Sequence, residues 1–151
     1  MGTHSRIGVM HGDTVKSVYC HYDGYLEHNG RILQEHYNSA RANHLVALGD
    51  LSSLCPEIDP GNDIHSFDTP KAGVCVFYGR DRDEEGVDFK VAHTFAAFLD
   101  QVEACGAEYY YIMRDGVWYC GSPYKGSQLV ALTEALAAIQ AETKTWETVD
   151  L

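Results

Sequence analysis

The chain has 151 residues, of which 45% are hydrophobic and 22% are charged, values typical of one folded globular domain rather than of a disordered chain. Eleven Lys and Arg residues against 22 Asp and Glu residues give a net charge of −11, which excludes general binding to the phosphate backbone of nucleic acids. No apolar run approaches the roughly 20 residues that cross a membrane, and the first residues lack a secretory signal, so we expect a cytoplasmic protein without a membrane partner.

The five cysteines are scattered along the chain. They are odd in number and contain no Cys-x-x-Cys pair. This pattern predicts neither a disulfide framework nor a thiolate zinc site, and it favours a reducing compartment.

The first fifty residues predict a β-hairpin followed by two helices. Residues 7–10 and 14–22 are strand-like and flank a His-Gly-Asp turn. Asn29 is the expected N-cap of the first helix, and Ser39 is that of the second, which ends at Gly49.

The middle of the chain is less regular. Residues 50–70 contain three prolines and predict a long irregular segment, which compact domains rarely carry without a function. Residues 72–78 predict a buried strand, and residues 80–88 form a charged stretch.

The last third predicts two helices around a second hairpin. Thr94 caps a helix that ends at Gly106, and residues 109–114 and 117–120 enclose an Asp-Gly turn. Ser127 starts the final helix. Because helices and hairpins come in mixed order, we expect a single α+β domain over residues 1–151, a mainly antiparallel sheet with helices packed on a face.

Residues 19–30 are the densest polar stretch and lie where a strand ends and a helix begins. Unpaired backbone N–H groups at such a junction can receive an anion. The candidate ligand-binding residues here supply hydrogen-bonding groups, rings and a flexible glycine, and they are His21, Tyr22, Asp23, Gly24, Tyr25 and Asn29. The structural alternative is a turn with one helix cap and exposed polar side chains.

The same stretch contains the donor atoms of a metal site in His21, Asp23, Glu27 and His28, so a metal-dependent hydrolase is one alternative function. Their spacing matches no known two-ligand helix motif, and we therefore expect no metal or other cofactor. Cys20 and His21 are adjacent on a strand and point to opposite faces, so they cannot form a nucleophilic pair, and we assign no catalytic residue.

Three arginines are candidate phosphate ligands. Arg80 and Arg82 follow the predicted buried strand and could clamp a phosphate through bidentate contacts, with Arg6 as a further cation. The structural alternative is that Arg80 and Arg82 pair with the acidic residues beside them.

The chain resembles a family of small uncharacterised phage and prophage proteins. The segments that carry the resemblance are Thr-His-Ser-Arg-Ile-Gly-Val at 3–9, Tyr-Cys-His-Tyr-Asp-Gly-Tyr at 19–25 with Asn-Gly at 29–30, His-Ser-Phe at 65–67, Val-Phe-Tyr-Gly-Arg-Asp-Arg at 76–82, and Asp-Gly-Val-Trp-Tyr at 115–119. Relatives often have Trp in place of Tyr22. The resemblance implies a phage accessory protein in the bacterial cytoplasm, and such proteins often counter host defence by sequestering nucleotide signals or by blocking a host protein.

These observations predict a non-catalytic protein that binds a small anionic, nucleotide-like ligand. The arginines would meet phosphate, His21, Asp23 and Asn29 would bond the base or ribose, and Tyr22 or Tyr25 would stack on the ring. The main alternative is an acidic inhibitor that imitates nucleic acid toward a basic host protein, through acidic loops at 57–68 and 81–88. A homodimer or a higher homo-oligomer is the expected assembly.

Overall fold

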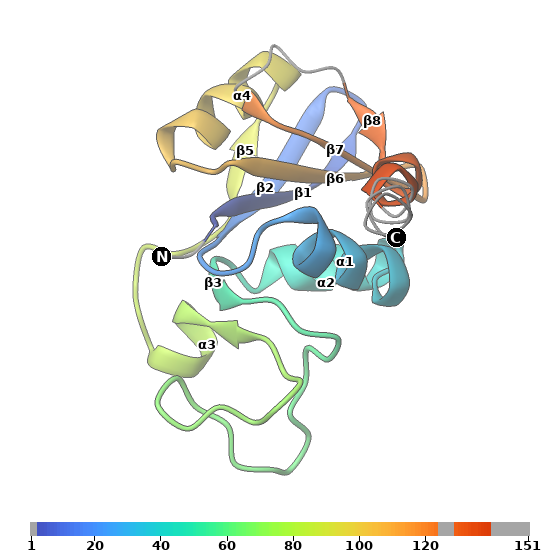
Figure 1. Cartoon of the computed structure of the whole chain (residues 1–151). Helices are drawn as coiled ribbons and strands as arrows, with labels where there is room; N and C mark the ends of the chain where they lie inside the picture. The colour runs from blue at the N-terminus through green and yellow to red at the C-terminus, as the bar shows by residue number, and fades with distance from the viewer. Residues whose placement is uncertain (1–2, 124–128, 140–151) are drawn as a thin grey trace, which may run out of the picture.

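The computed structural model describes residues 3–123 and 129–139, and within them eight strands form one sheet (Figure 1). The strands are β1 (Ser5–His11), β2 (Thr14–Cys20), β3 (Leu51–Ser53), β4 (Val76–Phe77), β5 (Lys90–Ala92), β6 (Tyr109–Arg114), β7 (Val117–Gly121) and β8 (Val130–Ala131). The helices are the π-helical turn η1 (Leu26–Gly30), α1 (Arg31–His36), α2 (Ser39–Ala47), α3 (Tyr78–Arg82), α4 (Phe95–Ala104) and a helix over residues 132–139. The predicted α+β class is confirmed.

The sheet is built outward from a parallel pair at its centre. Its order is β4-β3-β2-β1-β6-β7-β8, with β5 also paired to β2. The β1–β6 and β2–β3 pairings are parallel and the others are antiparallel. The sheet is therefore mainly antiparallel, as expected.

Helices cover both faces of the sheet. One apolar cluster joins β1, β2, β6 and β7 to α1, α2 and residues 132–139, with Leu33, Leu45 and Leu132 fully buried. A smaller cluster on the opposite face packs α4 against the sheet through Phe98 and Val102. Figure 1 shows α4 on one side of the sheet and α1 and α2 on the other. Alternation along each strand supplies both faces with side chains.

Several local signals produce the elements they predict. Gly12 has a φ of 61°, and the first hairpin turns at Gly12-Asp13 with His11 opposite Thr14. The Thr94 side chain accepts a hydrogen bond from the Ala97 N–H and caps α4.

Two predicted helix caps and one predicted strand differ from the structure. Asn29 does not cap α1, because it lies inside η1 with its side chain buried. Asn38 rather than Ser39 caps α2 by accepting from the Arg41 N–H. The predicted strand at 72–78 is reduced to β4, because Tyr78 already starts α3. The predicted helix start at Ser127 lies outside the described residues.

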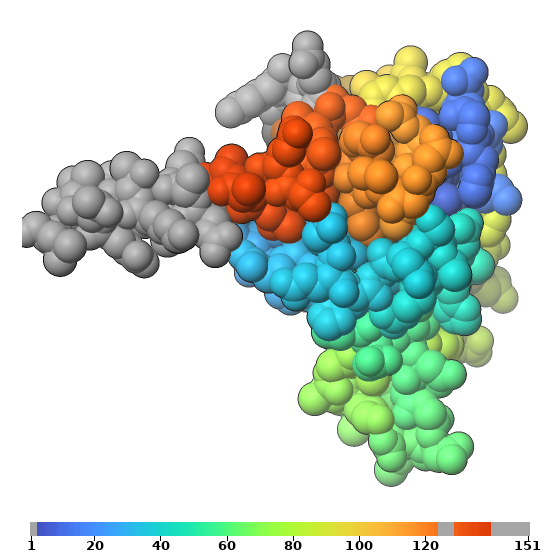
Figure 2. All heavy atoms as spheres, turned by 90° about the vertical axis from the view of Figure 1, so that its right-hand side faces the viewer, coloured from blue at the N-terminus to red at the C-terminus, as the bar shows by residue number. Residues whose placement is uncertain are grey.

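Residues 54–88 form a projection that we call the acidic lobe, in green at the bottom of Figures 1 and 2. It carries nine acidic and three basic residues, a net charge of −6 out of the chain's −11. Its regular structure is limited to β4, α3 and an isolated bridge between Glu57 and Val74.

No helix in the described part of the chain combines the length and the apolar character needed to cross a membrane.

Candidate functional site

The loop that follows β2 is fixed by backbone contacts on both sides. The His21 and Tyr22 N–H groups donate to the carbonyl oxygens of Leu51 and Ser52 at 3.1 and 3.0 Å. The Gly24 N–H donates to the Thr3 carbonyl at 2.7 Å. These bonds fix the backbone of the loop at His21, Tyr22 and Gly24.

Gly24 is required by close packing against the start of β1. A Cβ placed there would lie 2.7 Å from the Ser5 Cβ and 2.9 Å from the His4 carbonyl carbon. The Gly24 carbonyl accepts a hydrogen bond of 2.6 Å from the buried Tyr111 hydroxyl. Gly24 thus positions the loop rather than presenting a group to a ligand.

Four aromatic side chains gather where β1 begins and β2 ends, and we call them the imidazole–tyrosine patch: His4, Tyr19, His21 and Tyr22. The His4 and His21 rings are stacked with centroids 4.7 Å apart, and Tyr22 meets His21 edge-on at 4.6 Å. Tyr22 is 46% exposed. The patch is therefore a continuous aromatic surface with an open tyrosine at its margin.

Hydrogen bonds fix the two imidazoles and leave their outer edges available. The His4 Nδ1–H donates to the His21 carbonyl at 2.7 Å, and the His21 Nδ1 shares a hydrogen bond of 2.8 Å with the Tyr19 hydroxyl. Neither Nε2 atom has a partner among the residues that the structure describes. Two ring nitrogens are thus free to bond a ligand.

The surroundings shift the pKa values of the patch. Burial, and then the neighbouring His4, lower the pKa of His21, because both disfavour the charged form of its ring. Burial, and to a smaller extent the nearby Tyr78, raise the pKa of Tyr19 to about 12. At neutral pH His21 is therefore a neutral imidazole and Tyr19 keeps its hydroxyl proton.

The patch reaches the second motif through β3. Cys20 of β2 pairs with Leu51 of β3, and Leu51 pairs with Phe77 of β4. Tyr78 directly follows Phe77. Burial raises the pKa of Tyr78, and the nearby Tyr22 raises it further. The two polar motifs of the sequence are thus linked through neighbouring strands, by way of β3.

Asn29 lies in the interior and supports the loop from below. Its Nδ2 donates to the Ser5 Oγ at 3.2 Å and to the Cys20 Sγ at 3.3 Å. Its Oδ1 accepts from the His28 Nδ1–H at 2.9 Å. Burial raises the pKa of the Cys20 thiol to about 12, so Cys20 is a core thiol rather than a nucleophile.

Asp23 and Tyr25 flank Gly24 at the surface of the same loop. Asp23 has a φ of 57°, and its carbonyl accepts from the Asn29 N–H at 3.3 Å. Tyr25 precedes η1, and its ring contacts that of His28 with centroids 6.1 Å apart. Both remain close to the patch.

Arg6 lies in the interior and is only 1% exposed. Its Nε donates to the Ser17 Oγ at 2.8 Å and one Nη donates to the Ser17 carbonyl at 3.2 Å. Gly8 lies opposite Ser17, and the missing side chain leaves room on this face of the sheet. Arg6 therefore holds β1 to β2 and does not face the surface as a phosphate ligand would.

Arg80 is committed to the acidic lobe. It donates to both carboxylate oxygens of Asp81 and to the carbonyl oxygens of Ile58 and Cys75. Asp81 also accepts from the Phe77 N–H at 2.8 Å, and its side chain is only 4% exposed. The alternative in which Arg80 pairs with a neighbouring acid is thus what the structure shows.

His65 completes this network from the irregular part of the lobe. Its side chain is 1% exposed and its Nδ1 accepts from the Lys71 N–H at 2.9 Å. The proton is therefore on Nε2, which lies 3.0 Å from the Cys75 carbonyl and 3.2 Å from the Asp81 carboxylate. Both ring nitrogens are used, so His65 stabilises the lobe.

Arg82 remains at the lobe surface. Its guanidinium stacks on Phe67 at 4.7 Å, beside a cavity of about 540 Å³ that also involves Asp68 and Asp83. The acidic neighbours make this cavity a poor site for an anion.

The four candidate metal ligands do not converge. Within residues 3–123 and 129–139, no group of three or more His, Cys, Asp or Glu side chains is arranged to hold a metal ion. His21 and His28 each use Nδ1 in a local hydrogen bond.

Sequence reasoning missed His4, Tyr19 and Tyr78. The signal was the register of the first hairpin, because a two-residue turn at Gly12-Asp13 places Arg6 opposite Tyr19. Continued two residues outward from that pair, the same register brings His4 to His21. A three-residue turn does not give this pairing.

The chain matches no protein-family model, and no curated protein or solved structure matches it.

Proposed function

We propose that the protein is a non-catalytic binding protein that takes up a small, planar, anionic ligand of the nucleotide type at the imidazole–tyrosine patch. The observation that carries the proposal is the fixed aromatic cluster of His4, His21 and Tyr22, in which the two imidazoles are stacked and the edge-on Tyr22 is 46% exposed. Stacking on an aromatic ring contributes about 1–3 kcal/mol per base.

The negative charge of the ligand would be met by the imidazoles. A phosphate beside the free Nε2 atoms of His4 and His21 favours the protonated form of both rings. Because the pKa of His21 is lowered in the free protein, binding of an anion would raise it. The affinity should therefore increase as the pH falls through the His21 pKa.

The biological setting comes from the resemblance to phage and prophage proteins. A bacterial cytoplasm, a phage origin and removal of a nucleotide immune signal from the host form one consistent proposal. We include a homodimer or a higher homo-oligomer in this proposal, because symmetric homo-oligomers are the commonest assemblies.

Calorimetric titration with adenosine 5′-monophosphate and with cyclic di-adenylate tests the binding function. We expect saturable binding of at least one nucleotide to the native protein, and a loss of affinity of about tenfold or more in Tyr22→Ala and in His21→Ala. The matched control is His93→Ala, which removes an exposed histidine away from the patch.

The same titration separates the patch from the lobe arginine. Arg82→Ala should leave the affinity unchanged, because Arg82 lies on Phe67. Absence of binding by both nucleotides, or a loss confined to Arg82→Ala, would contradict the proposal.

The acidic lobe supports a second candidate function, binding of a basic protein. Eight of the nine acidic residues in the lobe are exposed. The apolar Ile64 lies in the same segment and is 83% exposed. A projecting surface of one charge with an apolar residue suits a basic partner, and such an association weakens steeply with salt.

Paired charge reversals test this candidate. The double variant Glu84→Lys/Glu85→Lys should lose host proteins that the native protein retains at low salt, whereas Glu103→Lys/Glu134→Lys, outside the lobe, should keep them. All four residues are exposed. Equal retention by both double variants would exclude the lobe as the contact surface.

A further inference from the structure

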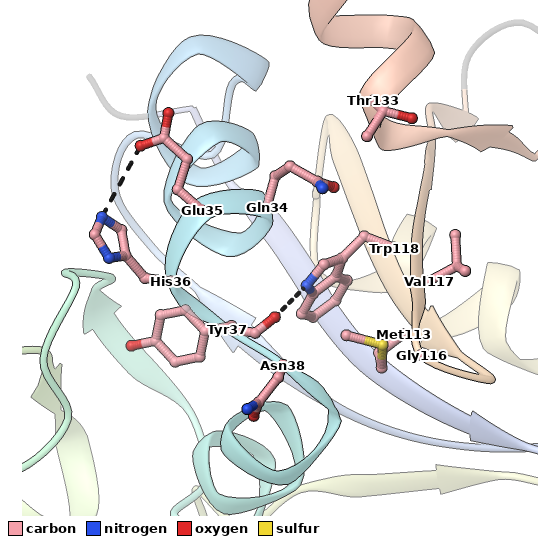
Figure 3. Close-up of a pocket in the computed structure, with 10 residues that line it drawn as sticks. All are labelled: Gln34, Glu35, His36, Tyr37, Asn38, Met113, Gly116, Val117, Trp118 and Thr133. Carbon is pink, nitrogen blue, oxygen red and sulfur yellow. Dashed lines mark hydrogen bonds and ion pairs between the residues drawn. The ribbon is translucent and has the colours of Figure 1, made fainter.

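A cavity of about 510 Å³ lies on the other face of the sheet and at the other end of β1 from the patch. It is bounded by α1, the start of α2, the β6–β7 hairpin and residues 132–139 (Figure 3). Figure 2 faces this side of the molecule, with α1 and α2 below β7. Its volume is within the range of roughly 300–1,000 Å³ that holds small ligands.

The inner wall of the cavity is apolar and rigid. Met113 and Trp118 are cross-strand partners, and they are 3% and 4% exposed. The Trp118 Nε1–H already donates to the Tyr37 carbonyl at 2.8 Å, so the ring offers only carbon to a ligand. A wall of this kind favours the flat face or edge of a small ring.

The rim of the cavity carries neutral hydrogen-bonding groups. Gln34 is exposed, and its carboxamide has no hydrogen-bond partner among the described residues. Asn38 uses Oδ1 to cap α2, which leaves its Nδ2–H groups as donors. Thr133 adds a hydroxyl from the helix above, and Figure 3 shows Gln34 and Thr133 over the Trp118 ring.

Among the residues that the structure describes, none presents a free cation to this cavity. His36 is paired with Glu35 at 3.9 Å, and both side chains point away from Trp118 in Figure 3. The nearby Arg41 donates to the carbonyl oxygens of His36 and Pro56 and lies over the Tyr37 ring. The site is therefore suited to a neutral ligand rather than to a phosphate.

We propose that this cavity is a second binding site, independent of the patch, for a small, neutral, planar molecule with amide-like donors and acceptors, of the size of a free nucleobase. Carboxamides and a hydroxyl around an apolar wall are the groups that orient such a ring.

Nuclear magnetic resonance titration of the full chain with adenine tests the proposal through the Trp118 indole N–H signal, assigned by Trp118→Phe. We expect a saturable shift of that signal with adenine, and at least tenfold weaker binding at this signal with adenosine 5′-monophosphate. A shift that does not saturate, or equal binding of both probes, would overturn the neutral-ligand assignment.

Two exposed valines provide a matched pair of variants. Val117 is 45% exposed on the rim, and Val91 is 41% exposed on β5, away from the cavity. Val117→Trp should weaken adenine binding at least about tenfold by filling the cavity mouth, while Val91→Trp should leave it unchanged. Equal effects would refute the site.

A second pair keeps the test valid if Val117→Trp does not fold. Gln34→Leu removes the free carboxamide from an exposed helix position with little effect on helix propensity, and it should weaken adenine binding several-fold. Glu35→Gln, whose side chain points away from the ring, should not. Unchanged adenine binding in Gln34→Leu would contradict the proposal that the carboxamide on the rim recognises the ligand.

Discussion

His65 in the acidic lobe and His21 in the imidazole–tyrosine patch illustrate two opposite uses of the same side chain. His65 is 1% exposed and both of its ring nitrogens are bonded within the lobe. His21 bonds Tyr19 through Nδ1 and leaves Nε2 without a partner in the described chain. The difference shows that saturation of hydrogen bonds, rather than residue type, separates a structural histidine from one available to a ligand.

The lobe needs its saturated network because regular structure is scarce there. Between Leu54 and Cys75 the chain has no helix or strand beyond an isolated bridge. Arg80, Asp81 and His65 supply the hydrogen bonds that a sheet would otherwise provide. The patch lies at the end of a regular hairpin, where the backbone pairing of β1 and β2 positions its residues.

The largest expected effect comes from breaking the lobe network with Asp81→Asn. The Asp81 side chain is 4% exposed and accepts hydrogen bonds from Arg80, His65 and the Phe77 N–H, and a hydrogen bond to a charged group contributes about 1.5–3 kcal/mol. We expect the free energy of unfolding in urea to fall by about 3 kcal/mol, and amide exchange in residues 54–88 to accelerate.

Asp83→Asn is the matched control for this prediction. Asp83 is exposed with a φ of 57°, a conformation that asparagine also adopts. Its effect should stay within about 0.5 kcal/mol. Equal losses in the two variants would show that the lobe does not depend on the buried network.

Acid should weaken the lobe through the same residue. Burial raises the pKa of Asp81, but hydrogen bonds from Arg80 and the Phe77 N–H outweigh it and lower the pKa below its usual value. The ionised Asp81 thus stabilises the lobe above the unfolded pKa of about 3.9, and this stability is lost as the pH falls through the folded pKa. Asp81→Asn should flatten the acid limb of a stability-against-pH curve.

A smaller effect is expected for Asn29→Ala beneath the patch. The change removes a buried amide that bonds Ser5, Cys20 and His28, and such losses cost about 1–3 kcal/mol. Thermal unfolding should show the decrease, whereas Asn62→Ala at an exposed position should have no measurable effect. A neutral result for Asn29→Ala would restore this residue as a candidate ligand group.

The smallest expected effect is a shift in titration without a change in fold. His4→Gln removes the second cause of the lowered His21 pKa and leaves burial, the larger one, in place. The His21 pKa, measured from its ring signals, should rise part of the way toward about 6.5. His44→Gln, at an exposed position of α2, should leave it unchanged.

This prediction also fixes the sign of a pH effect on stability. Because the folded pKa of His21 lies below the unfolded value, the unfolded chain binds more protons between the two. Stability is complete above about pH 6.5 and falls as the pH drops through the folded pKa. A stability that rises on acidification in this range would disprove the assignment.

The sequence predicted the parts of the fold that depend on local residues. The Asp-Gly turn between β6 and β7 and the Thr94 cap of α4 follow from local conformational preferences. The short strands β3, β5 and β8 were not predicted, because each is defined by its pairing with a distant strand rather than by its own pattern.

For the candidate site, too, the sequence predicted the position of the loop but not which polar side chains have partners inside the fold. His21 and Tyr22 lie at the predicted end of the strand, and the loop that carries them was correctly placed between β2 and the first helix. Arg6, Asn29 and Arg80 carry polar groups that the folded chain uses internally. Only the tertiary structure reveals which donors have already found partners.

The most direct test of the central claim is to follow the imidazole signals of the eight histidines during a titration with adenosine 5′-monophosphate. The account predicts saturable shifts and raised pKa values for His4 and His21, with the signals of His65 unchanged. Shifts at exposed histidines outside the patch, with His4 and His21 unaffected, would contradict it.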